Sequence, residues 1–241
     1  MTHDVVKDTM ISRASCRLFH STVTCLRKTP AEKRWVARQL RDPFVKAAQR
    51  ENYRCRSAFK LLEINEKHKF LRPGVKVVDC GAAPGAWSQV AVHQVNATGA
   101  NPEAPVGFVV GVDLLHISPL PGAAFLSRSD ILEPDVQARI QRLLLGGEAH
   151  VIVSDMAPNA SGIRELDQER LVELCRGVLC LAEKVLCAGG TLLCKFWDGA
   201  ESNLLRNRLT EAFRDVKTVK PLASRKESSE IYLLAKHYYK H

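Results

Sequence analysis

The chain has 241 residues, of which 46% are hydrophobic, enough for one large α/β domain with an extension. No apolar run approaches the ~20 residues that span a membrane, so we expect no membrane span. The eight cysteines include no C-x-x-C pair, which argues against a zinc site and against a disulfide framework, and we expect Cys80, Cys175 and Cys194 in the core.

The net charge of +9 is concentrated near the N-terminus. Residues 1–60 hold 14 Lys and Arg against 5 Asp and Glu, whereas residues 61–241 hold 21 of each. A basic segment ahead of a neutral globular part suits either a targeting segment or a nucleic-acid-binding arm. We expect both, in succession.

Residues 1–30 have the composition of a mitochondrial presequence. From Thr9 to Pro30 there is no acidic residue, but there are four Lys or Arg and seven Ser or Thr among apolar residues. A secretory signal would need a continuous apolar core instead. Asp4 and Asp8 interrupt the pattern, and a start at Met10 would give an acid-free leader. The alternative is a basic tail without a targeting role.

Residues 31–56 are predicted to form a helix-rich basic arm. Cationic and aromatic side chains alternate there, which suits phosphate neutralisation and base stacking on RNA. The residues concerned are Lys33, Arg34, Trp35, Arg38, Arg41, Phe44, Lys46, Arg50, Tyr53, Arg54 and Arg56. The alternative is a solvated helical face, which has nearly the same composition.

Residues 57–241 are predicted to form an α/β domain. After a helix that begins near residue 57, strands are expected at 75–80, 107–113, 124–127, 149–154, 190–197, 215–220 and 229–236, and helices at 86–95, 134–145, 165–187 and 201–213. Short apolar strands separated by helices indicate a mostly parallel, doubly wound sheet of about seven strands. Ligands of such sheets bind outside the carboxyl ends of the strands.

The first strand of this domain runs into a loop of small residues, Gly81-Ala82-Ala83-Pro84-Gly85-Ala86, followed by Trp87. Such a loop lets the polar part of a ligand approach backbone N–H groups at a helix N-terminus, because no large side chain blocks it. The alternative is a tight turn without a ligand. The G-x-G-x-x-G dinucleotide pattern is not met, since Ala83 stands at the second glycine position.

Three acidic residues follow successive strands beside this loop. Asp113 closes the second strand, where a carboxylate can accept hydrogen bonds from ribose hydroxyls. Asp130 follows the third strand and could contact an adenine amino group, and Asp155 ends the fourth. Each of them by itself could be a helix cap or a turn former.

Lys195 lies in a run, Leu192–Trp197, that otherwise reads as a central strand. A buried ammonium is costly unless it is paired, and desolvation lowers the pKa of a lysine toward the range of a useful base. Glu230 adjoins the last strand in a similar way. Together with Lys60 and Asp155, these residues could converge at one edge of the sheet. The alternative for Lys195 is a side chain that reaches solvent from an edge strand.

Five motifs in order resemble the FtsJ (RrmJ-type) ribosomal RNA 2′-O-methyltransferases: Arg56–Leu61, Asp79–Gln89, Ser154–Asn159, Cys194–Phe196 and Ser224–Glu230. The resemblance implies a Rossmann-like methyltransferase fold that uses S-adenosylmethionine. It also implies a catalytic tetrad of Lys60, Asp155, Lys195 and Glu230, with Lys195 as the base. The cofactor contacts that it implies are Gly81, Pro84, Gly85, Ala86, Trp87, Asp113, Asp130 and Asp155, without a metal.

With the presequence-like leader, the resemblance is to the mitochondrial members of the family in animals. It implies methylation of a uridine ribose in mitochondrial large-subunit rRNA, within a pre-ribosomal particle in the matrix, in support of ribosome assembly. The alternative is an rRNA-binding assembly factor that uses the fold as a platform.

Two other enzyme classes fit less well. The missing third glycine and the 32 residues from Gly81 to Asp113, against the usual ~20, count against a nicotinamide-dependent oxidoreductase. A base methyltransferase with a cysteine nucleophile is disfavoured because no cysteine follows a strand in a suitable turn.

Overall fold

The computed structural model describes residues 37, 40–159, 161–197, 202–225 and 228–240. The expected presequence (1–30) and the start of the expected basic arm (31–36) lie outside the described residues. Residues 39–241 form one compact unit. Among the helices of the described part, none has both the length and the apolar character to cross a membrane.

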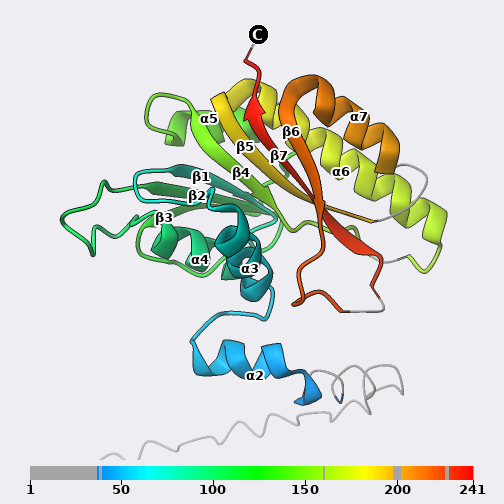
Figure 1. The fold of residues 1–241 in the computed structure, drawn as a ribbon, viewed down its shortest axis with the longest axis horizontal. Coiled ribbons are helices and arrows are strands. Elements are labelled where there is room, and N and C mark those ends of the chain that lie inside the picture. Colours follow the sequence, from blue (N-terminus) through cyan, green and yellow to red (C-terminus); the bar gives the residue numbers. More distant parts are fainter. Residues whose placement is uncertain (1–36, 38–39, 160, 198–201, 226–227, 241) are drawn as a thin grey trace, which may run out of the picture. The chain divides into compact units, whose positions relative to one another are not determined.

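Residues 39–241 contain a seven-stranded sheet with the order β3-β2-β1-β4-β5-β7-β6 (Figure 1). The strands are β1 (Lys76–Cys80), β2 (Phe108–Asp113), β3 (Ala123–Ser127), β4 (Ala149–Ser154), β5 (Leu186–Trp197), β6 (Phe213–Val219) and β7 (Glu230–Tyr238). The first five run parallel, and β7 lies antiparallel between β5 and β6. The strand order reverses between β1 and β4, where open α/β sheets bind their ligands. The expected mostly parallel sheet is confirmed.

Helices cover both faces of the sheet. They are α2 (Pro43–Arg50), α3 (Ala58–His68), α4 (Ala86–Gln94), α5 (Pro134–Leu143), α6 (Arg164–Val185) and α7 (Ser202–Ala212). Because successive strand residues point to opposite faces, Val77 belongs to the apolar cluster beneath α3 and α4, whereas Val78 belongs to the cluster beneath α5, α6 and α7. Two separate apolar layers therefore hold the sheet, which is the doubly wound arrangement.

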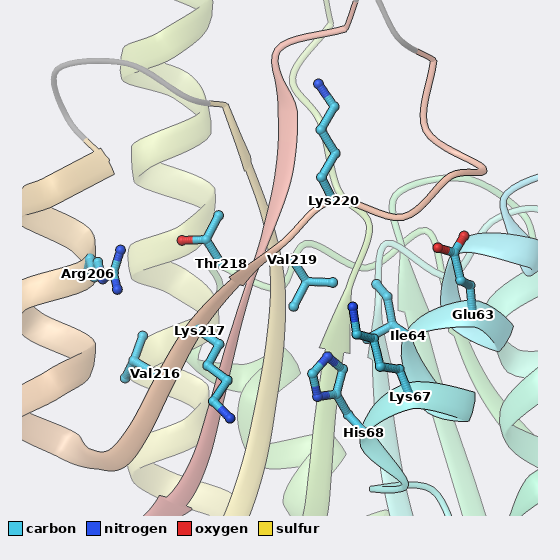
Figure 2. A pocket seen from close by; sticks show the side chains of 10 residues that line it. All are labelled: Glu63, Ile64, Lys67, His68, Arg206, Val216, Lys217, Thr218, Val219 and Lys220. Carbon is cyan, nitrogen blue, oxygen red and sulfur yellow. The ribbon is translucent and has the colours of Figure 1, made fainter.

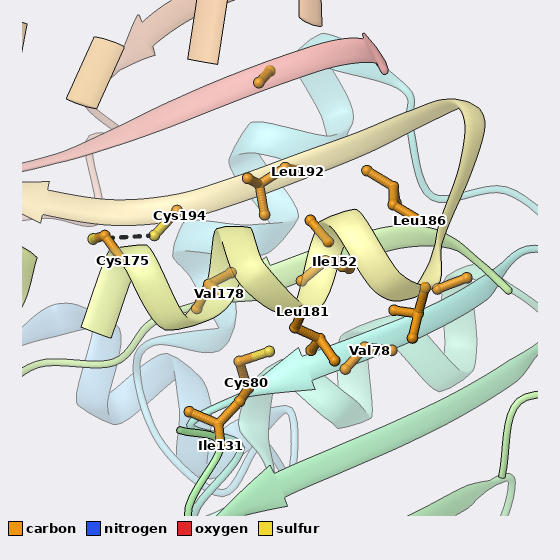
Figure 3. Packing of buried hydrophobic residues seen from close by; sticks show 14 of the residues in the cluster. Val78, Cys80, Ile131, Ile152, Cys175, Val178, Leu181, Leu186, Leu192 and Cys194 are labelled. Atoms are coloured by element: carbon orange, nitrogen blue, oxygen red, sulfur yellow. Dashed lines mark hydrogen bonds between the residues drawn. The ribbon is translucent and has the colours of Figure 1, made fainter. Parts of the chain in front are cut away.

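In the larger of these clusters, the buried Cys175 of α6 contacts the buried Cys194 of β5 (Figure 3). The Sγ atoms of Cys175 and Cys194 are 3.4 Å apart. The contact with Cys194, together with burial, raises the pKa of the Cys175 thiol well above its usual range. These side chains, like Cys80, are buried in the core as expected, and the thiol of Cys175 stays protonated at neutral pH.

The junction of α6 and β5 differs from the prediction. The helix ends at Val185, and the strand already begins at Leu186, which pairs with Ala149 of β4. The next pair is Val151 with Thr191, so one residue of β4 faces four residues of β5. The apolar residues before this bulge continue the helical pattern, which is why the sequence places the boundary too late.

Asp79 at the end of β1 is a buried carboxylate, with 1% of the residue exposed. Ser88 of α4 donates a hydrogen bond of 2.6 Å to its Oδ2 atom, and Oδ1 has no partner among the described residues. Burial raises the pKa of Asp79 from its ordinary value to about 7, against the opposing effect of the Ser88 hydrogen bond. The bond links the strand before the small-residue loop to the helix after it.

This raised pKa predicts a pH-dependent stability. The protonated acid is favoured in the folded state, so its contribution is fully present below the pKa of the unfolded chain, 3.8, and is lost as the pH rises toward about 7. The free energy of unfolding of the wild type relative to Asp79→Asn should fall by up to about 1.4 kcal/mol per pH unit in this window. Urea denaturation at pH 4 to 8 measures it; a difference independent of pH would contradict the prediction.

Gly107, just before β2, offers a test of the packing. A Cβ atom there would lie 2.5 Å from the carbonyl oxygen of Val95 and 2.6 Å from that of Val75. Both are backbone atoms, so Gly107→Ala should lower the free energy of unfolding by about 1–3 kcal/mol. In the control Gly177→Ala, the new atom meets the movable end of Leu132, and its cost should be clearly smaller. Equal costs in urea denaturation would refute the packing argument.

Candidate active site

Four charged side chains from four segments meet beyond the carboxyl ends of β4 and β5. The Nζ atom of Lys195 donates to the carbonyl oxygen of Asp155 at 2.6 Å and to its Oδ1 atom at 2.9 Å. The Nζ atom of Lys60 lies 2.8 Å from the carboxylate of Glu230. The crossed distances are 3.8 Å between Lys60 and Asp155 and 3.9 Å between Lys195 and Glu230. The four residues form one network with two positive and two negative groups.

The sheet positions this network. Lys195 on β5 is directly opposite Tyr232 on β7, and Trp197 is opposite Glu230. Only 8% of Lys195 is exposed, so its ammonium needs polar partners in place of water. Asp155, directly after β4, supplies them. This arrangement excludes the alternative of a lysine that reaches solvent from an edge strand.

Tyr232 is a further member of the site that the sequence did not single out. Its hydroxyl donates to Asp155 Oδ1 at 2.7 Å, and its ring centroid lies 5.7 Å from that of Trp87. Burial, followed by the charges of Asp155 and Glu230, raises the pKa of Tyr232 well above its usual range, so it remains a neutral donor. Its position two residues after Glu230, on the same face of the strand, is the signal that could have revealed it.

Asp113 at the end of β2 and Asp130 after β3 line a cleft of about 670 Å³ that reaches Asp155. Asp113 accepts hydrogen bonds from the backbone N–H groups of Ala83 and Leu115, and Asp130 accepts one from Leu132. These bonds fix the direction of both carboxylates. The cleft is lined by Gly81, Ala83, Val112, Asp113, Leu114, Leu115, Ser129, Asp130, Ile131, Asp155, Met156, Ala157, Pro158, Asn159, Arg170, Glu173 and Leu174.

Pro84, Gly85, Ala86 and Trp87 are not among the described residues that line this cleft. Trp87 is 2% exposed, and its indole N–H donates to the carbonyl oxygen of Ser57 at 2.8 Å. Within the small-residue loop, Gly81 and Ala83 therefore border the cleft, whereas Trp87 packs toward the start of α3.

Arg54 holds this loop from outside. Its guanidinium donates to the carbonyl oxygens of Pro84 at 3.0 Å, Ser118 at 2.8 Å and Pro119 at 2.7 Å. A Cβ atom on Gly85, whose φ is +108°, would lie 2.2 Å from Nη1 of Arg54. The arginine therefore ties the loop after β1 to the loop after β2, and both loops border the cleft.

Other side chains of the expected basic arm also make internal contacts. Arg56 lies 2.7 Å from the carboxylate of Asp42 and 5.5 Å from the centroid of the Phe44 ring. Phe44 and Tyr53 both pack on Phe59 of α3, with ring centroids 5.6 Å and 5.7 Å apart. These aromatic rings are engaged within the protein, whereas Arg41, Lys46 and Arg50 are exposed.

Comparison with known proteins agrees with this architecture. Residues 53–238 match the family model described as FtsJ-like methyltransferase. The chain is 43% identical over 211 residues to "rRNA methyltransferase 2, mitochondrial" of Drosophila melanogaster, covering 88% of this chain and 84% of the relative. It is 46% identical over 202 residues to "Ribosomal RNA large subunit methyltransferase E" of Ruegeria pomeroyi, covering 84% of this chain and 86% of the relative.

A solved structure supports the same assignment. The crystal structure of a putative ribosomal RNA methyltransferase from Plasmodium falciparum superimposes with a TM-score of 0.69 at 27% identity, covering 78% of this chain and 100% of the other. The family match covers most of the chain, including every strand of the sheet. The resemblance found in the sequence motifs is confirmed: the chain belongs to the FtsJ-like methyltransferase family.

Proposed function

We propose that this protein transfers a methyl group from S-adenosylmethionine to the 2′-oxygen of a uridine ribose in mitochondrial large-subunit rRNA. The observation that carries the proposal is the buried Lys195, held by two oxygens of Asp155 where the cleft ends. The relatives named as mitochondrial and as large-subunit rRNA methyltransferases support the substrate and the organelle. We also propose that the reaction takes place in the mitochondrial matrix, on rRNA within a pre-ribosomal particle.

The cleft fits S-adenosylmethionine in size and chemistry. Its volume of about 670 Å³ falls within the range of roughly 300–1,000 Å³ that holds small ligands. Asp113 and Asp130 can accept hydrogen bonds from hydroxyl and amino groups, and Leu114 and Ile131 offer apolar surface to a base. When bound, the cofactor supplies an electrophilic methyl group on a sulfonium.

Lys195 is suited to remove the proton of the attacking hydroxyl. A ribose hydroxyl is a poor nucleophile and benefits from a base within hydrogen-bond reach. A neutral lysine amine has two N–H groups and one lone pair. If both N–H groups remain bonded to Asp155, as the two short distances allow, the lone pair is left for the hydroxyl proton.

The neighbouring groups hold the amine of Lys195 in place. Asp155 accepts hydrogen bonds from its Nζ atom, and the carboxylate of Asp155 in turn lies 3.8 Å from the Nζ atom of Lys60. Glu230 holds Lys60, and the hydroxyl of Ser224 donates to Glu230 Oε1 at 2.7 Å. Because the reacting group is the 2′-hydroxyl, the proposed reaction is restricted to RNA.

Replacement of the base tests this proposal. Lys195→Ala should reduce the transfer of labelled methyl to mitochondrial large-subunit rRNA, or to its assembly particle, by roughly 10²–10⁴-fold. Binding of S-adenosylmethionine should be retained, because Lys195 does not line the cleft. The control Lys184→Ala, on the opposite face of the sheet, should keep normal activity.

The outcomes separate the two hypotheses. Near-normal turnover of Lys195→Ala would refute the role of the base. No transfer by the wild type to either substrate, with cofactor binding intact, would favour the assembly-factor alternative. Label on a ribose 2′-oxygen in the wild type, with loss in Lys195→Ala, would support both the reaction and the base.

Arg54 should act on cofactor affinity. Arg54→Ala removes the three hydrogen bonds that join the loops beside the cleft. We expect the KM for S-adenosylmethionine to rise roughly tenfold, which is the effect of losing about one hydrogen bond to a charged group. The kcat should change little, because Arg54 does not touch the network around Lys195. Arg50→Ala, an exposed arginine on α2, is the control. A fall in kcat with an unchanged KM would contradict this role.

A further inference from the structure

A second concave region lies around the edge strand β6, apart from the cleft described above. Figure 2 shows Lys67 and His68 of α3 on one side of β6 and Arg206 of α7 on the other. The region has a volume of about 580 Å³. We call it the β6 groove; it is lined by Glu63, Ile64, Lys67, His68, Arg206, Val216, Lys217, Thr218, Val219 and Lys220.

The β6 groove is strongly cationic. Lys67, Arg206, Lys217 and Lys220 line it and are all exposed. Among the described residues that line it, Glu63 is the one carboxylate, and it accepts hydrogen bonds from backbone N–H groups of the loop after β6: that of Leu222 at 2.9 Å and that of Ala223 at 3.2 Å. The carboxylate of Glu63 is thus directed toward that loop, and Lys220 donates to the carbonyl oxygen of Ser228 at 2.8 Å. The exposed side chains of Lys67, Arg206 and Lys217 are the cations most open to a ligand.

The side chain of His68 lies in the electrostatic field of these cations. Burial, then the charges of Lys236, Lys67 and Lys217, lower the pKa of His68 below its ordinary value. Lys236 lies close behind the groove, where its Nζ atom donates to the carbonyl oxygen of His68 at 2.7 Å. Cations from α3, β6 and β7 thus converge on one place, which differs from a solvated row of charges on a single helix.

The β6 groove and the catalytic network are carried by the same elements, α3 and the pair of β6 and β7. Lys60, Ile64 and Lys67 are spaced by four and three residues, so they lie on the same side of α3. The helix rise places Lys67 about 10 Å along the axis from Lys60. On the strand side, Val219 of the groove pairs with Tyr232, which contacts Asp155. One helix face and one strand pair therefore connect the groove to the reaction centre.

We infer that the β6 groove binds backbone phosphates of the RNA segment that flanks the methylated nucleotide. The inference rests on the proposed function and adds a binding site to it. A phosphodiester chain carries the repeated negative charge that these cations match, and Lys/Arg contacts of this kind position a nucleic acid without reading its sequence. An added protein strand fits less well, because lysines on an edge strand oppose strand addition.

The double variant Lys67→Gln/Lys217→Gln tests the groove. With an rRNA fragment that spans the target nucleotide, the Kd should rise roughly tenfold at 0.1 M salt, and the slope of log Kd against log salt should decrease by about 0.7 for each removed contact. At saturating RNA, kcat should be unchanged, because neither residue belongs to the network around Lys195. Binding of S-adenosylmethionine serves as the check for folding.

A matched control removes the same amount of charge elsewhere. Arg139→Gln/Arg142→Gln changes two exposed cations on α5 and should leave both the Kd and the salt slope close to those of the wild type. An unchanged slope in the groove variant, or an equal loss in the control, would overturn the inference. Failure of the proposed function looks different, because then the wild type itself would not methylate the RNA.

Discussion

The site depends on the pairing of one buried ammonium. Lys195 loses its water on burial and regains polar contacts from two oxygens of Asp155. Asp155 is held in turn by the hydroxyl of Tyr232, whose ring lies against Trp87 from the helix after the small-residue loop. The ends of β4 and β5 and the starts of β7 and α4 are thus tied to one carboxylate, so a change at any of them reaches the amine of Lys195.

The carboxylate of Asp79, which is more deeply buried, has a different environment. It has no lysine or arginine among its contacts in the described residues, and its pKa rises to about 7, whereas Asp155 faces two lysines. Asp79 lies before the small-residue loop and links it to α4 through Ser88. Two acids at the ends of neighbouring strands therefore have separate roles: Asp79 shapes the loop, and Asp155 holds the amine of Lys195.

Much of this architecture follows from the sequence, because apolar strand runs and small-residue loops are local patterns. A lysine within an apolar run is equally visible, which is why Lys195 could be singled out. The antiparallel direction of β7 could not be predicted, because the alternation of residues between the two faces of a strand is the same for either direction of the strand. The role of Arg54 could not be predicted either. Its partners are backbone carbonyls, which every residue has, and the segment around it has the composition of an RNA-binding arm.

The bulge at the start of β5 has a consequence for how family members can vary in length. Cys194 points toward α6 and Lys195 toward the opposite face, so a shift of one residue would exchange thiol and amine. The four residues between Leu186 and Thr191 face a single residue of β4, and two of them are exposed. Insertions or deletions in this stretch change only the size of the bulge, because regular pairing resumes at Thr191. The amine of Lys195 then stays on the face of the sheet where it meets Asp155.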